Sequence, residues 1–229
     1  MHPKTPTWLG QNPNLRRDEN HRYWVGDEVI AVSTTGVCGH DMTDFRRQQI
    51  EVTRHEWEPR GVNTHLALQL ELEARFHPSY GARQKAAEQR IENAEAFAQF
   101  REHIAPLVTH PLWSEVEVIA TEYMVASREL NLAGTFDGAF REEDKNSSDG
   151  YSYTIFDLKT QKKGGRPYSV KAQLGCYISL CSESGVRFDN AMVIWSRPNE
   201  TRLQSLTADE CLTAWRNKWS DYCKQERTV

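Results

Sequence analysis

The alternation of apolar and polar residues predicts strands in several parts of the chain. Residues 23–35, "YWVGDEVIAVSTT", alternate around a Gly-Asp turn, which is typical of a β-hairpin. Residues 116–160 are also rich in strand formers, and the polar stretch 141–150 interrupts them as the tip of a long hairpin. Two further strands are predicted over residues 187–195 and 202–206.

Helical periodicity predicts the intervening elements. Helices are expected over residues 41–54, 60–76, 83–104 and 168–181. A last helix follows Thr207, which forms a capping box with Glu210. The order is helices, a meander of strands, a helix, a strand and a helix. This order predicts an α+β (mixed α/β) fold, with a central sheet flanked by helices.

The length of the chain favours one domain. We expect residues 1–229 to form a single domain, in which the polar residues 1–22 are an N-terminal arm or loop. Mean hydropathy is −0.70, and no apolar run approaches the ~20 residues of a membrane helix. The opening "MHPKTPTWLG" lacks the apolar core of a signal peptide, so we expect a cytoplasmic protein with no membrane partner.

Charge is distributed unevenly. The net charge is −4, which by itself argues against non-specific binding of nucleic acid. Yet residues 159–173 contain five basic residues and no acidic one. These are either phosphate contacts or solvated loop charges, and charge alone favours the second interpretation. If the chain binds DNA, we expect the contacts to come from Lys162, Lys163, Arg166, Lys171 and Arg60.

The stretch "TIFDLKT", residues 154–160, carries the candidate chemistry. Side chains alternate along a strand, so Asp157 and Lys159 share one face. Asp137, in the preceding strand, has small neighbours on its own face, and hairpin pairing would place it beside Asp157. Two adjacent carboxylates repel unless a cation offsets them, and Mg²⁺ does so with carboxylate oxygens. The alternative interpretation is an Asp–Lys pair on a solvated sheet edge.

Two helices add polar residues with a similar ambiguity. His65 lies on the stripe that Val62, Gln69, Leu72 and Phe76 also occupy, so it faces the core side as a metal ligand or as a packed histidine. Gln173 and Tyr177 are four residues apart and share a helix face. They contact a nucleic-acid backbone, orient Lys159, or are ordinary polar edge residues.

Four short motifs in this order resemble the PD-(D/E)XK nuclease superfamily, in its RecB-like branch. They are "GVNTH" at 61–65, "GTFD" at 134–137, "DLKT" at 157–160 and the Gln173–Tyr177 pair. The earlier "VSTTGV" is similar to the opening of phage exonucleases and of the mitochondrial genome maintenance exonuclease. The resemblance covers about half of the chain well, from Gly61 to Tyr177.

The resemblance implies a set of roles. His65, Asp137, Asp157 and the Leu158 carbonyl would bind Mg²⁺ or Mn²⁺, Lys159 would be catalytic together with the two aspartates, and Gln173 and Tyr177 would complete the site. Some relatives carry an iron–sulfur cluster on four cysteines. The late cysteines here are spaced by 5, 30 and 12 residues, so we expect no iron–sulfur cluster and thiols that pack as small apolar groups.

The expected function is a metal-dependent DNA nuclease, and an exonuclease that acts on ends or single strands in recombination, repair or phage DNA processing. No helicase motif is present, so an unwinding or recombination partner would be a separate chain. A structure-specific endonuclease, a catalytically silent DNA-binding subunit on the same fold and a small-molecule hydrolase are the alternatives.

Overall fold

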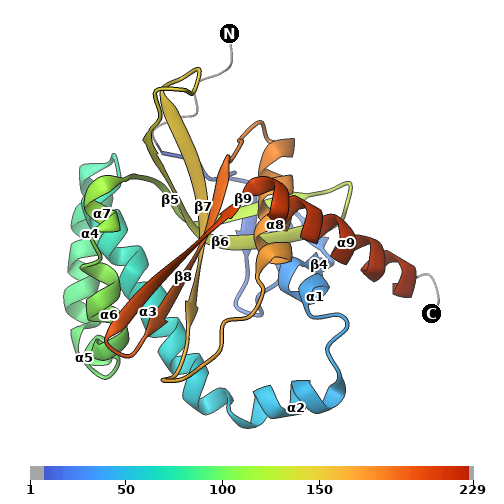
Figure 1. Ribbon diagram of the computed structural model, residues 1–229, viewed down its shortest axis with the longest axis horizontal. Helices are drawn as coiled ribbons and strands as arrows, with labels where there is room; N and C mark the ends of the chain where they lie inside the picture. Colours follow the sequence, from blue (N-terminus) through green and yellow to red (C-terminus); the bar gives the residue numbers. More distant parts are fainter. Residues whose placement is uncertain (1–7, 227–229) are drawn as a thin grey trace.

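A mixed six-stranded sheet forms the centre of the protein, as a computed structural model that describes residues 8–226 shows (Figure 1). The sheet order is β4-β6-β7-β8-β9, and β5 pairs with β6. Parallel pairs join β4 to β6 and β7 to β8, and the other pairs are antiparallel. The predicted mixed α/β fold is therefore confirmed. The strands are β4 (Val32–Ser33), β5 (Glu117–Ser127), β6 (Leu132–Glu143), β7 (Tyr151–Thr160), β8 (Asn190–Arg197) and β9 (Glu200–Thr207).

One edge of β6 is shared by two strands, and this division positions the site. On that edge β4 pairs with the start of β6, at residues 132–133, whereas β7 pairs with residues 138–143. Among the described residues, no strand pairs with residues 134–137 on this side, while β5 pairs with β6 between residues 132 and 141 on the opposite edge. The sheet is therefore open for one short stretch, which ends at Asp137.

Helices cover both faces of the sheet (Figure 1). One apolar cluster joins the sheet to α3, α6 and α7, with Leu68, Trp113 and Phe156 at its centre. The other joins it to α8 and α9, with Ile155 and Trp215 among its members. The helices are α1 (Thr34–Cys38), α2 (Asp44–Val52), α3 (Arg54–Phe76), α4 (Tyr80–Glu92), α5 (Ala94–Ala98), α6 (Arg101–Val108), α7 (Leu112–Glu115), α8 (Lys171–Glu183) and α9 (Ala208–Glu226).

The predicted N-terminal arm or loop is irregular over most of residues 8–22, but it packs against the rest of the protein and contains one short strand. Leu15 lies in β1 (Leu15–Arg17), which pairs with β2 (Tyr23–Val25). Leu9 is buried, and its N–H donates to the Ile119 carbonyl of β5. Leu9 and Leu15 provide the apolar contacts that a polar average over the segment conceals. Residues 1–7 lie outside the described part of the chain.

The hairpin predicted over residues 23–35 is confirmed only in its first part. β2 and β3 (Glu28–Ile30) pair across a turn where Gly26 has a φ of 63°, which favours glycine. Residues 32–33 instead pair with β6, and α1 begins at Thr34 with the Ser33 hydroxyl as its N-cap. The alternating pattern therefore spans two sheets: β2 and β3 pair in a small sheet with β1, and β4 belongs to the central sheet.

The single helix predicted over residues 83–104 is three helices, α4, α5 and α6. The Asn93 side chain donates to the Gln89 carbonyl at the end of α4, and this local hydrogen bond competes with continuation of the helix. Ile91, predicted to lie on the apolar face, is 76% exposed. Phe100 then breaks the helix a second time, because its φ and ψ of −117° and 23° are not helical. Periodicity alone did not detect these interruptions.

Smaller shifts occur at other boundaries. α3 begins at Arg54, six residues before the predicted start, and contains Pro59. α8 begins at Lys171, so Tyr168 lies in the preceding loop. The Thr207–Glu210 capping box at the start of α9 is confirmed, since each residue's backbone N–H donates to the other's side chain. Among residues 8–226, no helix is long and apolar enough to cross a membrane.

Candidate metal and phosphate site

Asp137 and Asp157 lie next to each other at the open stretch of the sheet. The last residue pair of β6 and β7 is Gly138 with Phe156, so the next position along brings the two aspartates opposite one another. Beyond this point an Asp137 carboxylate oxygen accepts the backbone N–H of Leu158. The carboxylate thus replaces a carbonyl of β6 as the partner of β7. The side-by-side arrangement predicted from strand alternation is present.

Gly134 allows two other elements to approach this stretch. A Cβ at Gly134 would lie 2.4 Å from the Thr34 hydroxyl and 2.6 Å from the Tyr177 ring, which no real Cβ tolerates. The glycine of "GTFD" therefore lets α1 and α8 pack against β6, three residues before Asp137. This close packing brings the polar face of α8 to the carboxylates.

Four residues form a connected set, which we call the lysine group: Asp157, Lys159, Gln173 and Tyr177. The Asp157 Oδ2 and Lys159 Nζ atoms are 2.6 Å apart. Gln173 Nε2 donates to Asp157 Oδ1 at 2.9 Å and to the Tyr177 hydroxyl at 3.1 Å. The Asp157 side chain is 2% exposed and that of Lys159 is 19% exposed, on a strand between β6 and β8. The pair is therefore not a solvated pair on a sheet edge.

Burial and charge oppose each other in the lysine group. Burial raises the pKa of Asp157 to about 6, although the Lys159 ammonium opposes this rise. Burial would lower the pKa of Lys159, but the Asp157 and Asp137 carboxylates outweigh burial and raise it. Lys159 is therefore protonated near neutral pH and provides a positive charge beside the carboxylates.

Three other residues form what we call the metal group: His65, Glu122 and Asp137. One ligand atom from each lies within 4.8 Å of the other two. His65 Nδ1 is 3.0 Å from Asp137 Oδ1, and the His65 side chain is 29% exposed. Its neighbours Thr64 and Leu68 are buried instead. His65 therefore lies beside the apolar stripe of α3 and not within it, unlike an enclosed core histidine.

The metal group also shifts its own pKa values. Burial would lower the pKa of His65, but its contact with the Asp137 carboxylate raises it. Burial would raise the pKa of Asp137, but His65, Lys159 and the Leu158 N–H lower it. Asp137 is therefore ionised, as a metal ligand must be.

Sequence reasoning missed Glu122. The flanking pairs of β5 and β6, Thr121 with Gly138 and Tyr123 with Phe136, place Glu122 opposite Asp137. Glu122 has a φ of 41°, a left-handed conformation that is unusual for glutamate. Burial, with the nearby Asp137 charge, raises its pKa to about 7. The signal in the sequence was an acidic residue in the middle of a strand whose other charged residue, Glu117, lies at its start.

The metal group fits Mg²⁺ or Mn²⁺, because two carboxylates and an imidazole are ligands that these ions accept. It differs from the predicted ligand set in one respect: Glu122 joins His65 and Asp137, whereas Asp157 is bound by Lys159 and Gln173. The Leu158 N–H faces Asp137, and within a strand the N–H and C=O of one residue point to the same side. The predicted Leu158 carbonyl therefore faces the same opening.

The predicted DNA-binding residues are in three different environments. Lys162, Lys163 and Arg166 are exposed in the loop after β7. Lys171 Nζ forms an ion pair with Glu210 at 2.8 Å, so its charge is already offset. Arg60 is half-buried on α3, beside Gly61, whose Cβ position lies 3.9 Å from the Thr160 hydroxyl. Three of the five are thus free to contact phosphates.

Three of the cysteines pack as apolar residues. Cys176, Cys181 and Cys211 are buried in the cluster between the sheet, α8 and α9. Burial raises the pKa of Cys181 to about 12 and that of Cys211 to about 11, so both thiols are protonated. This environment agrees with the interpretation of thiols as small apolar groups. The expectation of no iron–sulfur cluster stays a prediction.

Comparisons with known proteins add little to this geometry. No family model matches the chain, and no curated protein matches it. Among solved structures, the chain is similar to the crystal structure of SSO0001 at 14% identity and a TM-score of 0.33, over 71% of this chain and 74% of that chain. A likeness at that score carries no argument about fold or function. The site therefore stands on its own geometry.

Proposed function

We propose that the protein is a metal-dependent DNA nuclease that hydrolyses phosphodiester bonds, and that it acts as an exonuclease. One observation carries the proposal. Residues from α3, β5, β6, β7 and α8 bring an imidazole, three carboxylates, a largely buried ammonium and an amide together at the open stretch between β4 and β7. Such a combination offers metal ligands next to a fixed positive charge, which together stabilise the charge that develops in metal-dependent phosphodiester hydrolysis.

The chain's own groups divide the work. His65, Glu122 and Asp137 would hold Mg²⁺ or Mn²⁺, with Asp157 and the Leu158 carbonyl facing the same opening. A bound divalent ion lowers the pKa of a coordinated water and offsets the charge of the phosphate. Lys159 carries a proton and places its ammonium where negative charge grows on the phosphate oxygens.

Gln173 and Tyr177 act as positioning residues in this proposal. Gln173 donates to Asp157 and to the Tyr177 hydroxyl, so the amide orients the carboxylate that pairs with Lys159. Tyr177 is buried, and burial keeps the pKa of its hydroxyl well above the usual value. The hydroxyl therefore acts as a neutral hydrogen-bonding group and does not supply a proton.

DNA is the substrate that the surroundings favour. Lys162, Lys163 and Arg166 follow the catalytic strand β7 directly and are exposed, which suits contacts with successive phosphates. The motif resemblance extends the proposal to ends or single strands of DNA, with any helicase or recombination partner as a separate chain.

Cleavage of linear and circular DNA tests the proposal. We expect Mg²⁺ or Mn²⁺ to support loss of end-labelled linear DNA, single- or double-stranded, while circular DNA survives. Asp137→Asn is the matched control, because it removes a ligand charge without changing the side-chain volume. Cleavage of circles would make the protein an endonuclease. DNA binding without cleavage at any metal concentration would make it a silent subunit and would overturn the proposal.

A further inference from the structure

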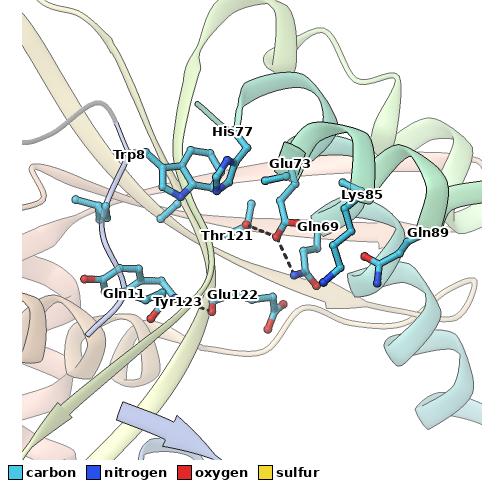
Figure 2. Close-up of a pocket in the computed structure, with 14 residues that line it drawn as sticks. Trp8, Gln11, Gln69, Glu73, His77, Lys85, Gln89, Thr121, Glu122 and Tyr123 are labelled. Atoms are coloured by element: carbon cyan, nitrogen blue, oxygen red, sulfur yellow. Dashed lines mark hydrogen bonds between the residues drawn. The ribbon is translucent and has the colours of Figure 1, made fainter. Parts of the chain in front are cut away.

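A cavity of about 420 Å³ adjoins the metal group, between β5 and the helices α3 and α4. Glu122 belongs to both places: its carboxylate is part of the metal group, and it also lines the cavity. Figure 2 shows Trp8 and His77 at one end of the cavity, Lys85 and Gln89 at the other, and Glu122 along the β5 side. The volume lies within the range of about 300–1,000 Å³ that small-molecule sites occupy.

A polar row on α3 leads from the metal group into this cavity. His65, Gln69 and Glu73 are spaced by four residues and share one side of the helix, and His77 follows at its C-terminal end. His65 and His77 are about three helical turns, or ~18 Å, apart along the helix axis. A DNA strand with one phosphate at the metal group therefore has room to continue along α3 as far as His77.

The far end of the cavity is aromatic. The rings of Trp8 and His77 are 4.7 Å apart, and the backbone N–H of Leu9 holds this segment on β5. Trp8 is partly exposed on the cavity side. Proteins bind the bases of single-stranded nucleic acids by stacking them on exposed aromatic rings of this kind.

Some polar groups of the cavity already have hydrogen-bond partners within the protein, and others are available to a ligand. Glu73 Oε1 accepts from both Gln69 Nε2 and the Thr121 hydroxyl, as the dashed lines in Figure 2 show. Within residues 8–226, by contrast, neither the Lys85 ammonium nor the Gln89 side-chain amide has a hydrogen-bond or ion-pair partner. A phosphate oxygen suits the first group, and a base edge or a sugar hydroxyl suits the second.

We propose that this cavity binds an unpaired nucleotide of single-stranded DNA, with its base against Trp8 and His77 and its phosphate near Lys85. The inference rests on the proposed function, because it takes the scissile phosphate to lie at the metal group. It adds that the base is bound some distance along the strand from that phosphate, at one fixed position. Paired DNA presents a base to this cavity only if the base is flipped out of the duplex, so the site favours single strands.

An abasic scan of binding tests the proposal without any cleavage. Fluorescent single-stranded oligothymidylates, each with one abasic position, are titrated with the wild-type protein in EDTA. We expect one position to weaken binding on the order of tenfold, as loss of one stacked base does. In Trp8→Ala, no abasic position should weaken binding more than the others. In His77→Ala, the loss of affinity at the sensitive position should be smaller than in the wild type. Trp8→Phe should keep the sensitive position.

The role of the Lys85 charge is tested by the salt dependence of single-strand binding. Lys85→Ala should lower the slope of log affinity against log salt by about 0.7, the value for one phosphate contact with a single strand. Lys145→Ala, an exposed lysine at the tip of the β6–β7 hairpin, is the matched control and should leave the slope unchanged. Thermal unfolding of each variant shows whether it is folded.

Two results would overturn the inference: an abasic scan with the same sensitive position in wild type, Trp8→Ala and His77→Ala, or equal affinity for blunt duplex and single strand. Failure of the proposed function is a separate result. Wild-type protein that shows the Trp8-dependent scan but hydrolyses no DNA with Mg²⁺ or Mn²⁺ would lose the nuclease proposal and keep the nucleotide site.

Discussion

The lysine group and the metal group lie side by side, but their charges are compensated in different ways. In the lysine group the Asp157 carboxylate already has a cation at 2.6 Å and an amide donor at 2.9 Å. The metal group contains two carboxylates, and their partners are neutral or weakly basic groups: the His65 imidazole lies 3.0 Å from Asp137, and the Leu158 N–H donates to Asp137. Charge balance within the protein is therefore nearly complete on one side and incomplete on the other.

This difference indicates where a divalent cation would bind first. A cation at the metal group offsets the charges of Glu122 and Asp137, and so opposes the rise in the pKa of Glu122 that burial and the Asp137 charge cause. A cation at Asp157 must compete with Lys159, whose buried ion pair with Asp157 is costly to break. We therefore expect the metal group to determine affinity and the lysine group to determine rate. The predictions below test this division.

The largest effect is expected for Lys159→Ala. Loss of the ammonium removes the fixed charge next to the phosphate, so the cleavage rate should fall by about 10²–10³-fold, while Mn²⁺ affinity stays close to the wild-type value. Cleavage of end-labelled DNA and calorimetric Mn²⁺ titration measure the two quantities. Lys145→Ala, at the exposed tip of the β6–β7 hairpin, is the control of equal charge. Near-normal hydrolysis by Lys159→Ala would remove the role assigned to the lysine group.

His65→Ala should weaken Mn²⁺ binding, which Lys159→Ala should leave close to the wild-type value. We expect Mn²⁺ affinity to fall by at least about tenfold, because one of three ligands is lost. The free energy of unfolding should change by less than ~1 kcal/mol, since the side chain is 29% exposed. Calorimetric titration beside thermal unfolding separates the two effects. Unaltered Mn²⁺ affinity with a clearly lower melting temperature would make His65 a structural residue and would weaken the RecB-like resemblance.

Substitutions in the exposed basic loop next to the lysine group should have a smaller effect, on the salt dependence of DNA binding. Replacing Lys162, Lys163 and Arg166 together by alanine should reduce the salt slope of single-strand binding by up to about 2, at about 0.7 per phosphate contact. Lys171→Ala should change it less, because Glu210 already pairs with that ammonium. Anisotropy titrations at several salt concentrations measure the slope. An unchanged slope in the triple variant would show that these residues are solvated loop charges that do not contact phosphates.

Glu122→Gln should give the smallest effect, on stability. Its folded pKa of about 7 lies above the ordinary value of 4.5, so ionisation of Glu122 destabilises the metal-free fold as pH rises through this interval. The amide variant avoids that loss, and we expect metal-free Glu122→Gln to be more stable than wild type at pH 8 by about 1–2 kcal/mol, but not at pH 5.

Mn²⁺ supplies the second half of the Glu122 experiment. It should raise the melting temperature of the wild type more at pH 8 than at pH 6, because protons compete for the carboxylate at the lower pH. In Glu122→Gln this increment should be smaller at pH 8. Equal increments in the two proteins would exclude Glu122 from the metal group and restore Asp157 as the second carboxylate ligand.

Sequence reasoning was most accurate where one segment's own geometry decides the outcome. Strand alternation placed Asp157 and Lys159 on one face, and both lie there at the site. Helical spacing placed Gln173 and Tyr177 on one face, and the two are hydrogen-bonded. The capping box at Thr207 is also formed. These relations need only the repeat of a strand or helix, which a sequence shows directly.

The same reasoning was least accurate where several segments meet. The residues 8–22 contribute buried leucines to the core, and the predicted helix 83–104 is interrupted twice, although neither feature disturbs the periodic pattern strongly. His65 was placed on the core stripe of α3, but it lies beside that stripe because α3 packs through Leu68 and Leu72. Here the neighbouring element, and not the helix itself, determines which face is buried.

By itself, the sequence determined the mixed α/β class, the pairing of Asp137 with Asp157 and the position of Lys159 beside them. Tertiary structure alone decided that Glu122, and not Asp157, lies within ligand distance of both His65 and Asp137, and that Trp8 meets His77 beyond it. Periodicity describes a residue's place on its own strand or helix. The left-handed backbone of Glu122, the opening between β4 and β7 and the docking of the N-terminal segment arise from packing between segments distant in the chain.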